Sequence, residues 1–416
     1  MAQFPLNRFL RALVLSGFGV LAAGAASLQA NAVIQAKGEL PADLRDRHGD
    51  TVGGIGSGII FDEKNGVYLC ISDRGPGDGT LPYTPRIAVL KISETGDRLE
   101  PALVDTILLT DEAGRPMTGL IPDDPAAETP RMKDGRTCID PEALALSPQG
   151  TIFVSDEYAP CLYEFTREGK MLRRIAFPEE FQPRNADGRP DYTDKAELVS
   201  GRHINQGPEG MCLLPDGKTA AVIFQSGLAQ EGGRESGLAR IALLDLESGK
   251  LTASYLHRFA DQIPDSGEPL GAGKVSANDL VALDAKRFLL LERDKIGRDG
   301  GRSHPVAAYK SVWLLDTEGA TDLLQHPLEQ AVPVKKAFVF NLAGLVPDPR
   351  SLNAKWEGIC VLPSSGKSEV TLLMTADNDF LTPLIHESGN TFPFPRAEDA
   401  VPSQFFKIRA TLPAIP

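Results

Sequence analysis

The stretch GPEGMCLLPDGKTAAVIFQSG, from Gly207 to Gly227, combines the features that decide the fold. A polar corner leads into a short apolar strand, Pro215-Asp216-Gly217 makes a tight turn, and a second apolar strand ends in another polar corner. Because proline fixes φ and glycine accepts a positive φ, this is the pattern of a hairpin turn. Both strands are apolar at nearly every residue, which predicts strands that are buried on both faces.

The same pattern recurs four more times along the chain. The other copies are GSGIIFDEKNGVYLCISDRG from Gly56, DPEALALSPQGTIFVSDEY from Asp140, SANDLVALDAKRFLLLERD from Ser276 and KWEGICVLPSSGKSEVTLLMTADND from Lys355. A third apolar strand often follows, and fourth candidates are present as well. Four short strands per unit predict an all-β fold, a β-propeller with five countable four-stranded blades. A sixth blade has room around residues 100–135 or 320–345, and a pair of β-sandwiches is the competing architecture.

The units are further apart than compact propeller repeats of about 40–50 residues, so inserted loops are expected. The likeliest positions are 111–137, 178–206 and 257–275, which are rich in proline, glycine and charge. The fifth unit lacks an outer strand, and AVIQAKGEL at residues 32–40 can supply it. An N-terminal strand that closes the ring leaves no bare sheet edge, so residues 33–416 should form a single domain.

Residues 1–32 have the composition of a signal peptide. Arg8 and Arg11 precede an apolar run from Ala12 to Ala26, and Ala30-Asn31-Ala32 fits a small-x-small cleavage site. A membrane anchor is the alternative, but the run is short for a bilayer span and no other segment approaches that length. The sequence therefore predicts an exported protein that is periplasmic or secreted and has no membrane contact after cleavage.

The charge of the chain limits its partners. The formal net charge is −13, and cleavage would remove two arginines and no acid. Nucleic acids and anionic membranes both require a basic surface, so neither is an expected partner. A small anionic or ester substrate and a monomeric state are predicted instead. The cysteine count of 5 is odd, so not all can pair within one molecule, and pairing of Cys138 with Cys161 stays open.

The polar corners of the units should meet. A hairpin returns the chain to its starting side, and inner propeller strands surround the axis, so these corners converge on one central mouth. Corners before the first strand hold Ser57, Glu142, Glu209, Asp279 and Glu357. Corners after the second strand hold Asp73, Arg74, Asp156, Glu157, Gln225, Ser226, Glu292, Arg293, Asp294, Asp377 and Asp379.

Converging carboxylates raise one another's pKa or recruit a cation. Oxygen ligands without paired His or Cys favour a hard ion such as Ca²⁺ over zinc. The predicted metal ligands are Asp73, Glu142, Asp156, Glu209, Glu357 and Asp377. Acids that only accept hydrogen bonds from nearby backbone amides are the alternative interpretation.

Other residues at these corners suggest roles in catalysis and binding. Glu142, Glu209 and Glu357 are the predicted catalytic carboxylates. His203 is a candidate general base, although a lone histidine in a loop is more often simply solvated.

Arginines at the corners are candidates for substrate binding. Arg74 and Arg293 are predicted to bind the anionic part of a substrate, because guanidinium groups match carboxylate and phosphate oxygens. Ion pairs with the acidic corners are an equally good interpretation of both arginines. The sequence has no G-x-S-x-G, HExxH or phosphate-binding G-x-x-x-x-G-K-[ST] motif, which argues against an α/β-hydrolase or a zinc peptidase.

These units resemble the phytase-like esterase family, described by its "esterase-like activity of phytase". The resemblance rests on G-S-G-I-x-F-D with SDRG (57–75), DPEALA with SDE (140–157), GPEG (207–210) and WEG with ADND (356–379), and covers about residues 50 to 410. It implies a propeller of exported bacterial proteins, related in name to calcium-dependent phytases, and leaves the reaction open. The Glu-Gly and Asp-Asn-Asp pieces are also similar to calcium-dependent lactonase propellers, in which a divalent ion polarises an ester carbonyl and activates water.

The leading hypothesis is therefore an exported, metal-dependent hydrolase of an ester or phosphoester, with its site at the axial mouth of the propeller. The alternative is a non-catalytic propeller that binds a small ligand or a protein partner at the same mouth, since fold does not decide function.

Overall fold

The computed structural model describes residues 31–124, 127–193, 195–298, 306–382 and 400–415. The predicted signal peptide, except for its last two residues, lies outside the described residues. Within the described part of the chain, no helix has the length and apolar character needed to cross a membrane. The fold is all-β, as predicted, and is built from short antiparallel strands.

Three separate antiparallel sheets contain four strands each, in the order of the sequence. The first comprises β6 (Pro141–Leu146), β7 (Ile152–Asp156), β8 (Cys161–Phe165) and β9 (Met171–Ala176). The second comprises β12 (Pro208–Leu213), β13 (Thr219–Phe224), β14 (Leu238–Asp245) and β15 (Leu251–Arg258). The third comprises β16 (Ser276–Ala282), β17 (Arg287–Arg293), β18 (Lys310–Asp316) and β19 (Lys335–Asn341).

The remaining long strands form an eight-stranded sheet made of two four-stranded antiparallel runs. One run is β2 (Ile55–Asp62), β3 (Val67–Ser72), β4 (Arg86–Thr95) and β5 (Arg98–Leu108). The other is β20 (Lys355–Val361), β21 (Glu369–Asp377), β22 (Ser403–Thr411) and β1 (Ala32–Leu40). A single parallel bridge between Lys37 and Arg98 joins the runs.

The N-terminal strand completes the last unit, as predicted. β1 pairs with β22 in antiparallel fashion from Ala32 opposite Ala410 to Leu40 opposite Ser403. The strand that is first in the sequence therefore lies beside the strand that is last.

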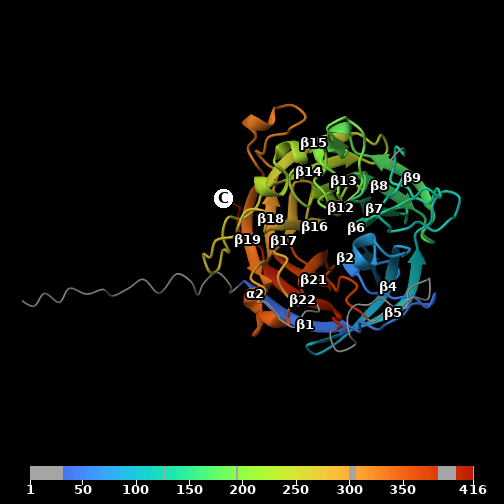
Figure 1. The fold of residues 1–416 in the computed structure, drawn as a ribbon. Helices are drawn as coiled ribbons and strands as arrows, with labels where there is room; N and C mark the ends of the chain where they lie inside the picture. The colour runs from blue at the N-terminus through green and yellow to red at the C-terminus, as the bar shows by residue number, and fades with distance from the viewer. Residues whose placement is uncertain (1–30, 125–126, 194, 299–305, 383–399, 416) are drawn as a thin grey trace, which may run out of the picture.

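The first strands of the five units contact one another in a closed ring, which we call the inner ring: β2, β6, β12, β16 and β20. Each contacts the next, and β20 contacts β2. In Figure 1, β2, β6, β12 and β16 lie near the centre, whereas β5, β9, β15 and β19 lie further out. The predicted corners therefore belong to strands that share one centre.

The shorter elements lie in the connections between strands. Two strands, β10 (Arg184–Asn185) and β11 (Leu198–Ser200), pair with each other within an expected insertion. The short helices are α1 (Pro76–Gly79), α2 (Leu342–Leu345), η1 (Glu179–Phe181), η2 (Ala229–Glu231), η3 (Gly233–Ser236), η4 (Leu328–Gln330) and η5 (Pro349–Ser351).

The hydrophobic core fills the spaces between neighbouring units. One cluster combines Leu291 of β17 with Trp356 of β20, Met374 of β21 and Phe406 of β22. The rings of Trp356 and Phe406 pack edge to face with centroids 4.9 Å apart. Because each inner strand packs against units on both sides, its residues are apolar on both faces.

A β-bulge interrupts the first hairpin of every unit at the same place. The register shifts fall between Ile55 and Gly58, Pro141 and Leu144, Pro208 and Gly210, Ala277 and Asp279, and Trp356 and Gly358. The equivalent polar residues at these bulges are Ser57, Glu142, Glu209, Asn278 and Glu357. In the fourth unit Asn278 thus takes the place that the sequence analysis gave to Asp279.

The residue after the bulge must allow the neighbouring inner strand to approach. A Cβ atom on Gly210 would lie 2.5 Å from the Leu280 nitrogen and 2.6 Å from the Asp279 Cα atom, so only glycine fits there. Asp279 itself accepts hydrogen bonds from the backbone nitrogens of Leu280 and Ile359, each at 2.8 Å. Its carboxylate therefore binds backbone between two inner strands.

Glu292, at a corner of the fourth unit, belongs to a buried network away from the other acids. Its Oε1 lies 2.7 Å from His257 Nε2 and accepts a hydrogen bond from Lys336 Nζ at 3.1 Å, and its Oε2 accepts one from the Tyr309 hydroxyl at 2.6 Å. Burial raises the pKa of Glu292, but the Lys336 charge and the hydrogen bonds outweigh it and lower the pKa to about 2.

We expect Glu292→Gln to destabilise the protein by about 2–3 kcal/mol at neutral pH, the range for a hydrogen-bonded buried charge. The folded-state pKa lies below the unfolded value of about 4.3, so this stability is present above pH 4–5 and is lost as the pH falls toward 2. Urea unfolding at pH 7 and pH 3 measures the difference. A deficit that stays equal at both pH values would contradict the prediction. Glu318→Gln, in an exposed pair with Lys286, is the matched control.

Candidate functional site

The side chains at or just after the end of the second strand of each hairpin occupy equivalent positions. Register pairs Asp377 with Lys355 and Arg293 with Ser276, and backbone hydrogen bonds place Glu157 opposite Asp140. The full equivalent set is Asp73, Glu157, Gln225, Arg293 and Asp377. Together with the bulge residues, these side chains stand at one end of the inner ring.

Asp156 does not belong to this set, although it was predicted as a metal ligand. Successive strand residues point to opposite faces, so Asp156 and Glu157 point in different directions. Asp156 Oδ1 accepts hydrogen bonds from the backbone nitrogens of Asp140 at 2.9 Å and Tyr158 at 3.1 Å, and its Oδ2 lies 3.7 Å from Cys161 Sγ. Cys161 and Cys138 are both free, buried thiols. Asp156 therefore fits the alternative interpretation of an acid that binds backbone.

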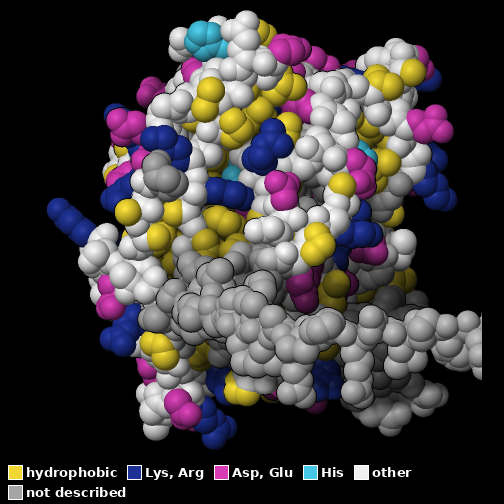
Figure 2. Space-filling model, turned by 90° about the vertical axis from the view of Figure 1, so that its left-hand side faces the viewer, with side chains coloured by type: hydrophobic (Ala, Val, Ile, Leu, Met, Phe, Trp, Pro, Cys, Tyr) yellow, Lys and Arg dark blue, Asp and Glu magenta, His cyan; other side chains and the backbone are white. Residues whose placement is uncertain are grey.

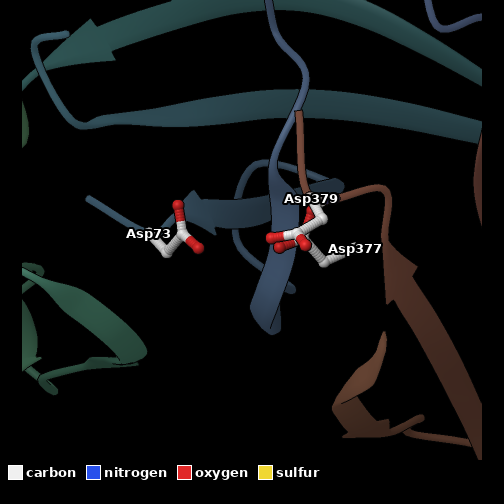
Figure 3. A group of neighbouring side chains, drawn as sticks. All are labelled: Asp73, Asp377 and Asp379. Carbon is white, nitrogen blue, oxygen red and sulfur yellow. Dashed lines mark hydrogen bonds between the residues drawn. The ribbon is translucent and has the colours of Figure 1, made fainter. Parts of the chain in front are cut away.

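The first acidic group comprises Asp73, Asp377 and Asp379, each of which has one oxygen within 4.8 Å of the others. Asp73 follows β3, while Asp377 ends β21, so two units contribute to the group. In Figure 3 the carboxylates of Asp377 and Asp379 lie together and Asp73 lies across from them. The Lys355 ammonium also belongs here, with Nζ 2.8 Å from Asp379 Oδ1, 3.7 Å from Asp73 Oδ2 and 4.0 Å from Asp377 Oδ2.

The second acidic group comprises Asp140, Glu142 and Glu157, again with one oxygen of each within 4.8 Å of the others. Asp140 and Glu157 are almost fully buried, and Glu142 is partly exposed. Arg74 borders this group, with Nη1 3.5 Å from Asp140 Oδ2. Arg74 is thus an ion-pair partner of the acids, and its guanidinium also lies 5.8 Å from the centre of the Tyr158 ring.

Mutual repulsion and burial disturb the ionisation of these carboxyls. Burial, followed by the charges of Glu209 and Asp140, raises the pKa of Glu142 well above its ordinary value. Burial also raises the pKa of Asp73 to about 8, against the lowering effect of Lys355. The Asp140 charge acts on Asp73, and the Asp73 charge acts on Glu142, so the two groups are electrostatic neighbours. A cation placed between such carboxylates would offset their repulsion.

One carboxylate oxygen of Glu209 accepts a hydrogen bond, and the other accepts none from the described residues. Gln225 Nε2 donates to Glu209 Oε1 at 2.5 Å, and Gln225 in turn accepts a hydrogen bond from Gln206. Among the described residues, Glu209 Oε2 is a buried atom with no hydrogen-bond partner. Burial and the charges of Glu157 and Glu357 raise the pKa of Glu209 well above its ordinary value. The hydrogen bonds of Gln206 and Gln225 therefore fix the Glu209 carboxylate and leave its Oε2 available to bind an ion or a proton.

Glu357 and Arg293 form a buried pair, in which Arg293 Nη2 donates to Glu357 Oε1. Arg293 is about 1% exposed, so its guanidinium is enclosed by protein. The ion-pair interpretation of Arg293 thus fits the structure better than direct contact with a substrate. Glu357 also acts on the pKa of Lys355. Burial alone would lower that pKa, but the charges of Asp379, Glu357 and Asp73 raise it well above its ordinary value.

His203 belongs to neither acidic group and lies in the wall of a cavity of about 570 Å³. Arg74 and Arg234 line the same cavity, and Arg74 connects it to the second acidic group. Burial, with a contribution from Arg234, lowers the pKa of His203. His203 Nδ1 lies 3.3 Å from the Ile204 carbonyl oxygen. The structure thus places His203 beside the acids rather than among them.

The sequence analysis missed part of the site. Asp140 and Lys355 stand just before the predicted corners, and they lie opposite Glu157 and Asp377 in the register. The signal that could have identified them is their position, two residues before the bulge glutamates Glu142 and Glu357.

The donor atoms at this end of the inner ring fit a hard divalent cation. The metal-ligating side chains of both groups are carboxylates, and the Lys355 ammonium lies among those of the first group. Within the described part of the chain, buried oxygens without hydrogen-bond partners include Ser57 Oγ, Glu209 Oε2, Asn278 Oδ1 and Asp377 Oδ2. Three of these four belong to bulge residues. Oxygen-rich sites with spare lone pairs are what Ca²⁺ requires.

A second cavity, of about 590 Å³, lies on the downstream halves of the five inner strands. Its lining is largely aliphatic and includes Ile59, Leu144, Leu213, Val281 and Ile359. These residues follow the bulges, so this cavity is distinct from the cavity that His203 lines.

This chain is similar in sequence to a secreted protein and, distantly, to solved structures. A secreted protein of Arthroderma benhamiae, named "Uncharacterized secreted protein", is 30% identical over 440 residues, covering 83% of this chain and 86% of the relative. Among solved structures, Kuenenia stuttgartiensis hydrazine synthase matches 80% of both chains with 12% identity and a TM-score of 0.31. A luciferin-regenerating enzyme matches 92% of this chain and 96% of its own with 9% identity and a TM-score of 0.35. The similarities to these two solved structures are too distant to carry an argument about fold or function.

The family model is decisive because it spans most of the chain. The model described as "Phytase-like: Esterase-like activity of phytase" matches residues 50–380. That range contains both acidic groups, all five bulges and the cavity lined by His203. Membership supports a hydrolase that acts on ester bonds. The chain belongs to the phytase-like family described by the esterase-like activity of phytase.

Proposed function

We propose that this protein is an exported, Ca²⁺-dependent hydrolase of esters or phosphoesters, with its site at the axial mouth of a five-bladed β-propeller. The observation that carries the proposal is the second acidic group, Asp140, Glu142 and Glu157, beside the free Oε2 of Glu209. Five four-stranded antiparallel runs around the inner ring support the propeller, with β1 as the outer strand of its fifth blade.

Two observations support export. The relative from Arthroderma benhamiae is a secreted protein. Arg8, Arg11 and the apolar run to Ala26 have the pattern of a cleavable signal peptide. A periplasmic or secreted location would also supply calcium at the concentrations that extracellular sites of modest affinity require.

The second acidic group is the site that we assign to the ion. Asp140, Glu142 and Glu157 would hold it, and a bound divalent ion would supply Lewis acidity toward the carbonyl or phosphoryl oxygen of the substrate. We assign proton transfer to Glu209 Oε2, because Gln225 fixes the other oxygen of that carboxylate. A raised pKa suits a carboxyl that must both accept and return a proton.

The substrate that we propose carries an anionic group. The cavity lined by Arg74, His203 and Arg234 adjoins the second acidic group, and its two arginines are suited to carboxylate or phosphate oxygens. Asp78 and Glu235 also line this cavity, and Asp78 Oδ1 lies 3.7 Å from Arg74 Nη2, so Asp78 offsets part of the Arg74 charge. Arg74 would orient the substrate.

The proposed partners are limited to such small molecules. On the face drawn in Figure 2, outside the grey region, basic and acidic side chains are interspersed, and neither sign forms one continuous patch. With a formal net charge of −13, this supports the exclusion of nucleic acid and anionic membrane as partners. A monomer remains the proposed state.

Removal of calcium should abolish turnover. We expect protein dialysed against a chelator to lose hydrolysis of p-nitrophenyl esters and of phytate, and added Ca²⁺ to restore it, because the ion supplies several kcal/mol of transition-state stabilisation. Full activity after chelation would exclude the ion. Calcium binding without turnover of any ester would favour the alternative, a propeller that binds a ligand at the same mouth without catalysis.

A further inference from the structure

Lys355 distinguishes the two acidic groups. Its Nζ contacts all three carboxylates of the first group, at 2.8, 3.7 and 4.0 Å from Asp379, Asp73 and Asp377. The positive charges near the second group come from side chains at its border. Arg74 Nη1 lies 3.5 Å from Asp140 Oδ2, and the charges of Arg202 and Arg74 oppose the rise that burial causes in the pKa of Glu157. An ammonium is thus present inside one group, where a metal ion would otherwise lie.

The position of Lys355 is fixed by the fold. It begins β20 and lies opposite Asp377 in the register of the β20–β21 hairpin. Asp73 comes from the neighbouring unit, after β3, so the ammonium links the first and fifth units. The Lys355 side chain is only 24% exposed, so its position is largely enclosed by protein.

The first group also retains an unused ligand atom. Asp377 is about 1% exposed, its Oδ1 accepts a hydrogen bond from the Asp379 backbone nitrogen at 2.7 Å, and its buried Oδ2 has no hydrogen-bond partner among the described residues. That oxygen faces Lys355 Nζ at 4.0 Å, too far for a hydrogen bond. The group therefore offers more oxygen donors than one ammonium satisfies.

We infer that Lys355 is a resident counter-cation that occupies the metal position of the first acidic group, so that the protein binds a single calcium ion, at Asp140, Glu142 and Glu157. This inference rests on the proposed function only where it places the calcium ion in the second acidic group. It assigns Lys355 a positioning role: the ammonium holds Asp73, Asp377 and Asp379 together beside the reacting groups without being a ligand itself. Removing the ammonium should convert the first group into a second calcium site.

Counting bound ions tests the inference. Isothermal titration calorimetry with Ca²⁺ should give one ion for the wild type, two for Lys355→Met and one for Lys355→Arg, which keeps the positive charge. Lys407→Met is the matched control, because Lys407 pairs with Glu94 at 2.6 Å far from both groups, and it should still bind one ion. Circular dichroism of each variant establishes that it is folded before the titration.

Each outcome decides either the role of Lys355 or the binding of calcium in the proposed function. Two ions in the wild type, or no more ions in folded Lys355→Met than in the wild type, would overturn the role of Lys355. No ion in the wild type and one in Lys355→Met would support the role of Lys355 and reject calcium in the proposed function. If Lys355→Met does not fold, a wild-type crystal soaked in Ca²⁺ decides: ion density is expected among Asp140, Glu142 and Glu157, and density among Asp73, Asp377 and Asp379 would overturn the inference.

Discussion

Glu157→Gln is expected to lower kcat for ester hydrolysis by about 10²–10³-fold, while its neighbour Asp156→Asn leaves kcat per folded molecule at the wild-type value. Glu157 belongs to the second acidic group, and loss of a carboxylate there weakens the cation and its transition-state stabilisation, at about tenfold per 1.36 kcal/mol. Asp156 points to the opposite face and accepts hydrogen bonds from backbone nitrogens.

The measurement is steady-state hydrolysis of a p-nitrophenyl ester in excess Ca²⁺, with the active concentration corrected for the folded fraction. Asp156→Asn should lower thermal stability, because its carboxylate contacts backbone and the Cys161 thiol, so that fraction must be measured for each variant. Equal losses of kcat in the two variants would show that the group does not act through Glu157. Retained kcat in Glu157→Gln would remove the second acidic group from the mechanism.

Arg86→Met is expected to cost about 3–5 kcal/mol of folding free energy, the largest stability effect that the structure predicts. Arg86 is fully buried, and its guanidinium donates to Asp46 at 2.7 Å and Asp50 at 2.9 Å. It also lies over the Tyr83 ring, 4.3 Å from its centre. Methionine would fill the volume but leave two buried carboxylates without their cation.

Chemical denaturation at pH 7 measures the effect of Arg86→Met. Arg287→Met is the matched control, because Arg287 forms a half-exposed pair with Asp284 at 2.7 Å, and such pairs contribute about 0–1 kcal/mol. A loss below 1 kcal/mol in Arg86→Met would contradict the prediction. Arg86→Lys should recover part of the stability, since lysine restores the charge but not both hydrogen bonds.

The architecture could be predicted from the sequence because it rests on repeated patterns. Hairpin turns such as Pro215-Asp216-Gly217 and apolar strands recur in five units, and each recurs in the structure as an antiparallel run. The role of residues 32–40 followed from counting strands, since an unpaired edge is costly in a closed ring. A strand or turn misplaced by one residue in one unit leaves this prediction unchanged, because the other units show the same pattern.

The site could be predicted only in part, because its chemistry depends on single-residue register. Asp156 and Glu157 are adjacent, and only the strand register decides which faces the acids. The bulge in the fourth unit makes Asn278, not Asp279, the equivalent of Glu209. Bulges insert one residue without a clear mark in the sequence. Lys355 was missed because a lysine at the start of a strand belongs to no motif until its three partners are known.

The pairing of β1 with β22 has a consequence for how the chain reaches its folded state. β1 is the first described strand to be synthesised and its partner is the last, with Ala32 finally lying opposite Ala410. Such a contact between distant residues forms slowly, because the entropic cost of closing the loop must be met first. Until residues 403–411 have been made, β1 lacks the strand it pairs with along its length. A nascent chain thus cannot complete its last unit until synthesis is nearly finished.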